Sequence, residues 1–207
     1  MADFAPFEGK AMSRPRCSRC QRPLMRCLCA LIPSLVSKTE VLMLQHPSET
    51  GHALNTARLA ALGLTNAELR IGERFDELPV NDDRESYLLF PGDDAVPLTK
   101  LAAEGRALRL IVPDGTWRKA RKLLHLNPVL ASLPRVALPE GLTSRYRLRK
   151  APMPGALSTL EAIVVALNAL EGEGRFDALL RPFEVLIQTQ IDAMGAEVFQ
   201  RNHGNKP

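Results

Sequence analysis

Five short apolar runs, each ending at or followed by proline, glycine or a His-Pro pair, limit the folds open to this chain of 207 residues. They span 39–45, 68–71, 86–92, 107–115 and 135–139. Runs this short, bounded by turn residues, are typical of β-strands, and helical patterns separate several of them. The alternation predicts an α/β domain with a mainly parallel sheet, in which ligands bind beyond the carboxyl ends of the strands.

Two helices are expected in the first two thirds of the chain. In 53–64, leucines recur at helical intervals and Gly63 provides a stop. The segment that follows Gly115 is also predicted to be helical, with Thr116 as its candidate N-cap.

The last third of the chain predicts two further helical stretches. The segment 158–172 opens with Ser158-x-x-Glu161, which is a capping box placed directly before an apolar run, and it closes on glycine. The stretch 176–199 is amphipathic, and we expect Pro182 to interrupt it.

The composition favours one core and no membrane segment. Hydrophobic residues make up 45% of the chain, which at this length is enough for a single domain. No apolar run is long enough to cross a bilayer, and residues 1–16 lack the continuous apolar stretch of a secretory signal. We therefore expect a cytoplasmic protein with a globular domain at 37–200 and a small appendage at 1–36 whose start is disordered.

All the cysteines of the chain lie within one short segment, as Cys17, Cys20, Cys27 and Cys29. Disulfides are rare in a reducing cytosol, so these thiols are better explained as metal ligands. Four soft ligands in one loop match the tetrahedral thiolate set of a structural zinc site, which leaves no open position for catalysis. A redox-active CxxC pair and a chance cluster are the alternatives.

Basic residues gather at three places and suggest a nucleic-acid partner. The net charge of +4 is modest, but arginines alternate with the cysteines, and two more clusters lie beside turn-rich segments. A zinc-fixed knuckle that carries arginines suits the binding of phosphate, whereas the alternative is a solvated basic surface. The RNA-binding candidates are Arg19, Arg22, Arg26, Arg118, Arg121, Arg149 and Lys150.

Common cofactor and catalytic motifs are missing from the sequence. There is no GxGxxG opening a helix after the first strand, no GxxxxGK[ST], no HExxH and no GxSxG. A Rossmann site, a P-loop, a zincin site and a hydrolase elbow are therefore not supported.

Five blocks in order make the chain resemble the DTW-domain family of tRNA-uridine aminocarboxypropyltransferases, which is related to the SPOUT methyltransferases. The blocks are CSRCQRPLMRCLC, LQHPSE with NTARL, LFPGDDA, VPDGTW and RLRKAPMPGALSTLEA, between Cys17 and about Glu161. The resemblance implies a SPOUT-like catalytic domain at 37–200, and a trefoil knot in it would rest on the resemblance alone. It also implies transfer of the 3-amino-3-carboxypropyl group of S-adenosylmethionine to N3 of a tRNA uridine, typically variable-loop position 47, with methylthioadenosine as the by-product.

The resemblance places the S-adenosylmethionine site at the strand ends and in the proline-rich loop before Ser158. The residues expected to bind this co-substrate are Pro91, Gly92, Pro113, Gly115, Leu148, Pro152, Leu157 and Ser158. Because a sulfonium is already a good leaving group, displacement at the carbon attached to it depends mainly on the orientation of the reactants. No metal is therefore required at the reacting centre.

Three residues of the VPDGTW block are the catalytic candidates. Asp114 is the candidate for the general base that removes the N3 proton, although Pro-Asp-Gly is also a common turn. Trp117, the sole tryptophan, either lies against the sulfonium or the target base, or packs in the core. Thr116 caps the following helix, whose amides would then face the carboxylate of the donor.

Weaker candidates are the polar side chains after the first strand and the acids of the FPGDDA block. They are His46, Glu49, His52, Asn55, Asp93 and Asp94, whereas Arg58 is interpreted as a solvated surface residue. Two other functions stay open on the residues alone: a SPOUT-like RNA methyltransferase, and a zinc-knuckle RNA-binding protein without chemistry. The oligomeric state and the choice of tRNA cannot be predicted from these patterns.

Overall fold

A six-stranded, all-parallel sheet forms the centre of the molecule in the described part of this computed structural model, which covers residues 15–80, 82–102, 106–148 and 155–203. The expected disordered start, Arg149, Lys150 and Pro152 lie outside these residues. The strands are β1 Glu40–Gln45, β2 Ala67–Ile71, β3 Glu85–Leu89, β4 Val96–Pro97, β5 Leu108–Asp114 and β6 Arg135–Ala137. Their order is β2-β1-β5-β3-β6-β4, which confirms the predicted α/β class.

Strands β1 and β5 are buried on both faces, which explains their nearly continuous apolar sequences. In β1, Val41 and Met43 face one apolar cluster, whereas Leu42 and Leu44 face the other. Because side chains alternate along a strand, one short run supplies both layers of the core.

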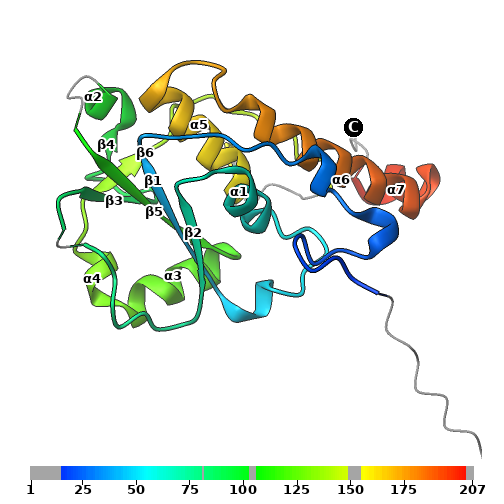
Figure 1. The fold of residues 1–207 in the computed structure, drawn as a ribbon, viewed down its shortest axis with the longest axis horizontal. Coiled ribbons are helices and arrows are strands. Elements are labelled where there is room, and N and C mark those ends of the chain that lie inside the picture. Colours follow the sequence, from blue (N-terminus) through cyan, green and yellow to red (C-terminus); the bar gives the residue numbers. More distant parts are fainter. Residues whose placement is uncertain (1–14, 81, 103–105, 149–154, 204–207) are drawn as a thin grey trace, which may run out of the picture.

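Helices cover both faces of this sheet (Figure 1). One layer holds α1, α2, α5 and α6, and α3 and α4 lie on the opposite side. The helices are α1 Ala57–Gly63, α2 Leu98–Ala102, α3 Trp117–Leu126, α4 Pro128–Ala131, α5 Thr159–Glu171, α6 Leu180–Met194 and α7 Ala196–His203. Four short 3₁₀ turns are also described, η1 Leu24–Arg26, η2 Cys29–Leu31, η3 Pro47–Glu49 and η4 Asp177–Leu179.

Two of the predicted helix limits are wrong. Helix α1 begins at Ala57, four residues later than the leucine pattern indicated, because 50–55 forms a loop in which Asn55 Oδ1 accepts a hydrogen bond from the Arg58 amide. Pro182 does not interrupt α6. It lies in the first turn of that helix, where no backbone N–H is needed, and Gly195, with φ of 85°, separates α6 from α7 instead.

The N-terminal segment that carries the cysteines packs on the main core. Cys20, Leu28 and Ile32 belong to the same buried cluster as β1, α1, α5 and α6. The Leu35 amide donates to the carbonyl of Gly63, and the Thr65 amide donates back to the carbonyl of Leu35. The cysteine segment is thereby held against the end of α1.

An ion cluster around a buried arginine lies at the amino end of the sheet. The Arg109 side chain on β5 is 3% exposed, and it donates to both carboxylate oxygens of Glu40 on β1 and of Asp82. The Arg109 guanidinium lowers the pKa of Asp82.

In the described residues, no helix is both long enough and apolar enough to span a membrane.

Candidate functional site

Asp114 is the last residue of β5 and is buried at the carboxyl edge of the sheet. In the parallel register it pairs with Gln45, the last residue of β1. Gln45 Nε2 donates to Asp114 Oδ2 at 2.7 Å, and the Thr159 hydroxyl, at the start of α5, donates to Oδ1. Two other elements therefore orient this carboxylate, which a purely turn-forming aspartate would not require.

Asn55 connects this carboxylate to the loop before α1. Its amide exchanges two hydrogen bonds with Gln45, both of 3.2 Å, and also donates to the carbonyl of Glu49. The loop 50–55, Gln45 and Asp114 therefore form one hydrogen-bonded chain that fixes the carboxyl ends of β1 and β5.

The turn from β5 into α3 has the predicted cap. Thr116 Oγ1 accepts a hydrogen bond from the Lys119 amide at 3.4 Å. Gly115 has φ of 151°, and a Cβ there would lie 3.1 Å from the Cβ of Lys119, so glycine permits the tight turn. Lys119 in turn forms an ion pair with Glu49 at 2.6 Å, which ties the start of α3 to η3.

A large cavity, of about 940 Å³, opens between the carboxyl ends of β3, β5 and β6 and the start of α5. Its lining is mostly apolar. Of the residues expected to bind the co-substrate, Pro91, Pro113, Gly115 and Leu157 line it. A cavity of this size at the carboxyl edge of a parallel sheet is where such folds bind small ligands.

Trp117 lines the same cavity and is half-buried. Its ring contacts Phe90, with ring centroids 5.5 Å apart at an angle of 60°. The tryptophan is thus not enclosed in the core, and one part of it remains available to a flat or cationic ligand.

The loop 142–147 closes another side of the cavity and is held by the capping box of α5. The predicted box is present: Ser158 Oγ accepts from the Glu161 amide, and the Glu161 carboxylate accepts from the Ser158 amide. The same buried carboxylate also accepts from the Arg145 amide at 2.6 Å and from the Ser144 hydroxyl. Glu161 therefore fixes both the helix start and the loop wall of the cavity.

A second, more polar cavity of about 340 Å³ lies beside the first. Asp114, Leu148 and Ser158 line it, so two of the residues expected at the co-substrate site lie here and not in the larger space. Within the described part of the chain, the two cavities share only Gly115, Tyr146 and Thr159 as lining residues. The Asp114 carboxylate consequently lies next to the large cavity, close to where the two spaces meet.

The four cysteines converge as predicted. Their Sγ atoms all lie within 4.8 Å of one another. Cys17 and Cys29 are 3.6 Å apart, and Cys20 and Cys27 are 3.8 Å apart. Four sulfurs placed tetrahedrally at zinc–sulfur bond length would be separated by about 3.8 Å, whereas a disulfide would need about 2 Å. The cluster can hold a metal ion.

The thiols of this cluster differ in acidity. Backbone amides of Cys20 and Arg19 lower the pKa of Cys17 to about 6, whereas burial and the neighbouring thiols raise the pKa of Cys29 to about 12. A bound cation removes the cost of placing several thiolates together, because metal ligation releases the thiol protons.

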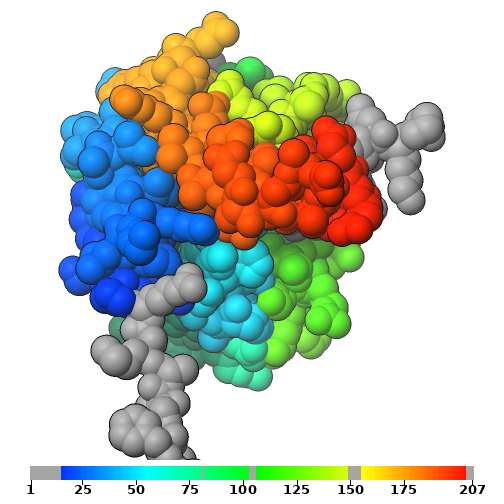
Figure 2. All heavy atoms as spheres, turned by 90° about the vertical axis from the view of Figure 1, so that its right-hand side faces the viewer, coloured from blue at the N-terminus to red at the C-terminus, as the bar shows by residue number. Residues whose placement is uncertain are grey.

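The described basic candidates do not all behave alike. Arg19, Arg26, Arg118 and Arg121 are exposed, whereas Arg22 is partly buried and donates to the carbonyl of Ala53 at 2.8 Å. Burial lowers the pKa of Arg22. The knuckle, defined as residues 15–32, lies beside the segment around residue 50, and α6 and α7 cross the same face (Figure 2).

Several weaker candidates have structural roles. His46 Nδ1 caps η3 through the Ser48 amide, and its Nε2 lies 2.8 Å from Glu73. Asp93 and Asp94 line neither the large cavity nor the polar one. Gly92 also lines neither of them. It allows a close approach by Arg135, because a Cβ at Gly92 would lie 2.6 Å from Nη1 of that guanidinium.

Four site residues were missed from the sequence, namely Gln45, Thr159, Tyr146 and Arg58. The position of Gln45 at the end of a predicted strand was a usable signal, because ligands gather at that edge. Arg58 was interpreted as a solvated residue, but the structure places its Nε in a buried position beside the knuckle.

Comparison with known proteins gives a consistent set of similarities. A model of the DTW domain matches residues 14–191. The chain is 33% identical over 201 residues to "tRNA-uridine aminocarboxypropyltransferase 2" of Macaca fascicularis, covering 91% of this chain and 67% of that protein. It is 33% identical over 192 residues to the Drosophila melanogaster protein of the same name, covering 86% and 76%.

A plant relative is more distant. The chain is 28% identical over 196 residues to "tRNA-uridine aminocarboxypropyltransferase A" of Arabidopsis thaliana, covering 78% of this chain and 74% of that protein. No solved structure shows a significant match to the chain.

Proposed function

Because the chain belongs to the DTW-domain family, we propose that it transfers a 3-amino-3-carboxypropyl group from S-adenosylmethionine to N3 of a tRNA uridine. The names of its relatives support aminocarboxypropyl transfer to tRNA over methyl transfer and over RNA binding without chemistry. Variable-loop position 47 and a cytoplasmic location are part of the proposal.

One observation carries the chemical part of this proposal. A buried carboxylate, Asp114, lies at the edge of a polar cavity that adjoins a large apolar one, and Gln45 and Thr159 orient it. Removal of a proton from a bound nucleobase requires an oriented carboxylate next to a cavity for a small ligand, and this arrangement provides both.

The donor, when bound, supplies a carbon attached to a sulfonium, which is a good leaving group. Asp114 accepts the proton of uridine N3 while N3 bonds to that carbon, and the carbon–sulfur bond breaks to release methylthioadenosine. General-base assistance of this kind contributes about 10²–10⁴-fold to the rate. Trp117 offers its face to a cation or a base at the wall of the large cavity.

The residues expected to bind the co-substrate divide into two groups in this proposal. Pro91, Pro113, Gly115 and Leu157 contact the bulk of the donor in the large cavity. Leu148 and Ser158 face the polar cavity, where the carboxypropyl group and the uridine would meet.

The four cysteines hold a zinc ion in this proposal, and four thiolates leave it no open position. Its role is to fix the knuckle, whose arginines bind the tRNA backbone together with Arg118 and Arg121. The knuckle therefore acts on RNA affinity and not on the reacting atoms.

The experiment that tests the function uses unmodified tRNA and two preparations of S-adenosylmethionine, labelled on the methionine carboxyl carbon or on the methyl group. Label that reaches RNA only from the carboxyl preparation supports the proposal. Transfer of the methyl label alone would make the chain a methyltransferase, and transfer of neither label would reject both activities.

A further inference from the structure

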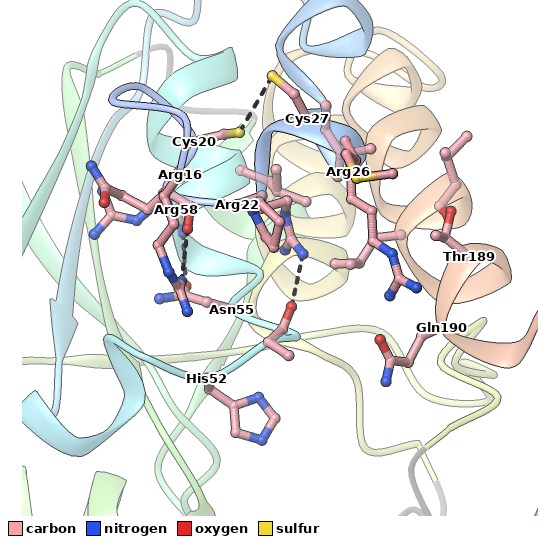
Figure 3. A pocket seen from close by; sticks show the side chains of 18 of the residues that line it. Arg16, Cys20, Arg22, Arg26, Cys27, His52, Asn55, Arg58, Thr189 and Gln190 are labelled. Atoms are coloured by element: carbon pink, nitrogen blue, oxygen red, sulfur yellow. Dashed lines mark hydrogen bonds between the residues drawn. The ribbon is translucent and has the colours of Figure 1, made fainter. Parts of the chain in front are cut away.

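A third cavity, of about 340 Å³, lies between the knuckle, the loop 50–55, the start of α1 and the face of α6 (Figure 3). It is separate from the large cavity, since the two share none of the described lining residues. Figure 3 shows the side chains that reach it from all of these segments, among them Arg22 of the knuckle, Arg58 of α1 and Thr189 of α6.

The lining of this cavity is strongly cationic. Four guanidinium groups belong to it, those of Arg16, Arg22, Arg26 and Arg58. Among the described residues that line it there is no aspartate or glutamate. Cys20 and Cys27 also line the cavity, and their thiolates offset part of this charge when zinc is bound. Four guanidinium groups still leave the lining positive, which favours an anionic occupant and suits phosphate oxygens in particular.

Two of these arginines have buried donors that no described group satisfies. The Nε atoms of Arg22 and Arg58 are enclosed and lack a hydrogen-bond partner in the described part of the chain. Buried donors in native proteins are nearly always paired. Because both Nε atoms are enclosed, an incoming anion reaches them only after the two side chains shift, and otherwise meets the outer nitrogens of the guanidinium groups. Since Nη1 of Arg22 is fixed by the carbonyl of Ala53, that side chain is already oriented.

The rest of the wall suits a flat ring better than a bare ion. Leu28, Leu31 and Leu186 supply apolar surface, whereas Gln190 supplies an amide group that can both donate and accept. An occupant that matches all of these features carries an anion, an apolar face and hydrogen-bonding edges. A nucleotide has this chemistry, and single-stranded RNA is recognised through such exposed bases.

The cavity also adjoins the candidate catalytic carboxylate. His52 and Asn55 line both this cavity and the polar cavity that contains Asp114. Asn55 is bonded to Gln45, and Gln45 is bonded to Asp114. An RNA chain whose reacting uridine lies near Asp114 can therefore place a neighbouring nucleotide beside the knuckle.

We propose that this cavity binds one nucleotide of the substrate RNA adjacent to the modified uridine, with its phosphate on Arg22 and Arg58 and its base against α6. The inference rests on the proposed function for the identity of the RNA. It adds a second binding position that fixes the register of the RNA, so that one uridine and not its neighbour reaches Asp114.

The test compares three variants of the full zinc-loaded protein for affinity to unmodified tRNA, measured by fluorescence anisotropy over a series of salt concentrations without S-adenosylmethionine. Arg58→Gln removes a guanidinium, and Thr189→Phe narrows the cavity from α6 without changing any charge. Arg106→Gln is the matched control, because Arg106 pairs with Glu85 at the opposite, amino end of the sheet.

We expect Arg58→Gln to weaken tRNA binding at least 10-fold and to reduce the slope of log affinity against log salt by about 1, as loss of one phosphate contact does. Thr189→Phe should weaken binding at least 5-fold, and Arg106→Gln less than 2-fold. Zinc content, thermal unfolding and affinity for S-adenosylmethionine should match those of the wild type, which excludes a general loss of structure.

Binding by Arg58→Gln equal to that of Arg106→Gln would overturn the site. Loss in Arg58→Gln with full binding by Thr189→Phe would also overturn it, since Arg58 would then be a surface phosphate contact and the cavity would not be entered. The labelled-donor assay separates the two proposals. If the wild type transfers no label but the variants weaken tRNA binding as expected, the proposed function is wrong and the nucleotide site stands. If the wild type transfers label but the variants bind tRNA normally, the proposed function stands and the nucleotide site is wrong.

Discussion

Asp114 is held by single hydrogen bonds from residues on two separate elements, Gln45 of β1 and Thr159 of α5. At the level of single residues, the sequence identified the carboxylate from its place in VPDGTW, but it could not identify these partners. Gln45 and Thr159 lie far from Asp114 along the chain, and their meeting depends on strand pairing and helix placement. Local patterns carry no information about such contacts.

We expect Asp114→Asn to lower kcat by about 10²–10⁴-fold while the affinities for tRNA and S-adenosylmethionine change little, because the amide keeps the shape but cannot accept the N3 proton. Single-turnover transfer with saturating donor and tRNA measures this step. Asp93→Asn, which alters an exposed acid outside the cavities, is the control. An unchanged kcat in Asp114→Asn would exclude it as the base.

At the level of elements, the strands and most helices were predictable because their signals are local. The capping box of α5 and the Thr116 cap of α3 lie in the sequence itself, and both are confirmed. The start of α1 and the continuity of α6 were predicted wrongly. The leucine pattern did not reveal that the residues before Ala57 form a loop. Pro182 lies in the first turn of α6, where a proline does not interrupt a helix.

The knuckle is expected to depend on its metal. Cys20→Ser replaces a buried ligand and should release most of the zinc, loosen the segment and weaken tRNA binding, because a site that lacks one thiolate loses much of its affinity. Zinc content by mass spectrometry and tRNA affinity test this, with the exposed Ser18→Ala as control. Full zinc content together with full affinity in Cys20→Ser would refute the structural-zinc proposal.

Glu161 should couple helix α5 to the cavity wall. Glu161→Ala removes the acceptor for the Ser158 and Arg145 amides, so we expect about 1–3 kcal/mol lower stability and weaker binding of S-adenosylmethionine. Urea unfolding and calorimetry measure the two effects. Glu184→Ala removes only the exposed pair with Arg145 and should change neither by much. If the Glu161→Ala variant binds S-adenosylmethionine normally, the loop 142–147 does not contribute to binding of this donor.

At the level of the whole molecule, the class of the fold followed from the sequence, but the strand order did not. The order β2-β1-β5-β3-β6-β4 rests on pairings such as Met43 with Val112, which local periodicity cannot specify. The separate cavities and their shared residues were equally unpredictable, because a cavity is a property of packed elements. The arginines of the knuckle were identified, but the role of α6 in enclosing them was not.

The stability of the molecule should depend on pH through the ion cluster at the amino end of the sheet. The pKa of Asp82 is lowered in the folded state by Arg109, so its contribution is present above its unfolded pKa, about 4, and is lost as pH falls through the lower folded value. Asp82→Asn should therefore be less stable than the wild type at pH 7, and the difference should shrink as pH falls below about 4.

Chemical denaturation at a series of pH values measures this difference. Asp83→Asn is the matched control, since it changes the adjacent exposed aspartate and leaves the bonds of Arg109 in place. A difference between Asp82→Asn and the wild type that stays constant from pH 7 to pH 2 would contradict the assignment to the carboxylate charge.

The position of Trp117 gives the protein an internal optical reporter. The chain has one tryptophan, it is half-buried against Phe90, and it lines the large cavity. Its emission therefore comes from one place, and filling of the cavity should change both its intensity and its wavelength. Titration with S-adenosylmethionine should give a saturable change in tryptophan fluorescence without any added dye. If the fluorescence changes with tRNA but not with S-adenosylmethionine, the donor binds outside this cavity.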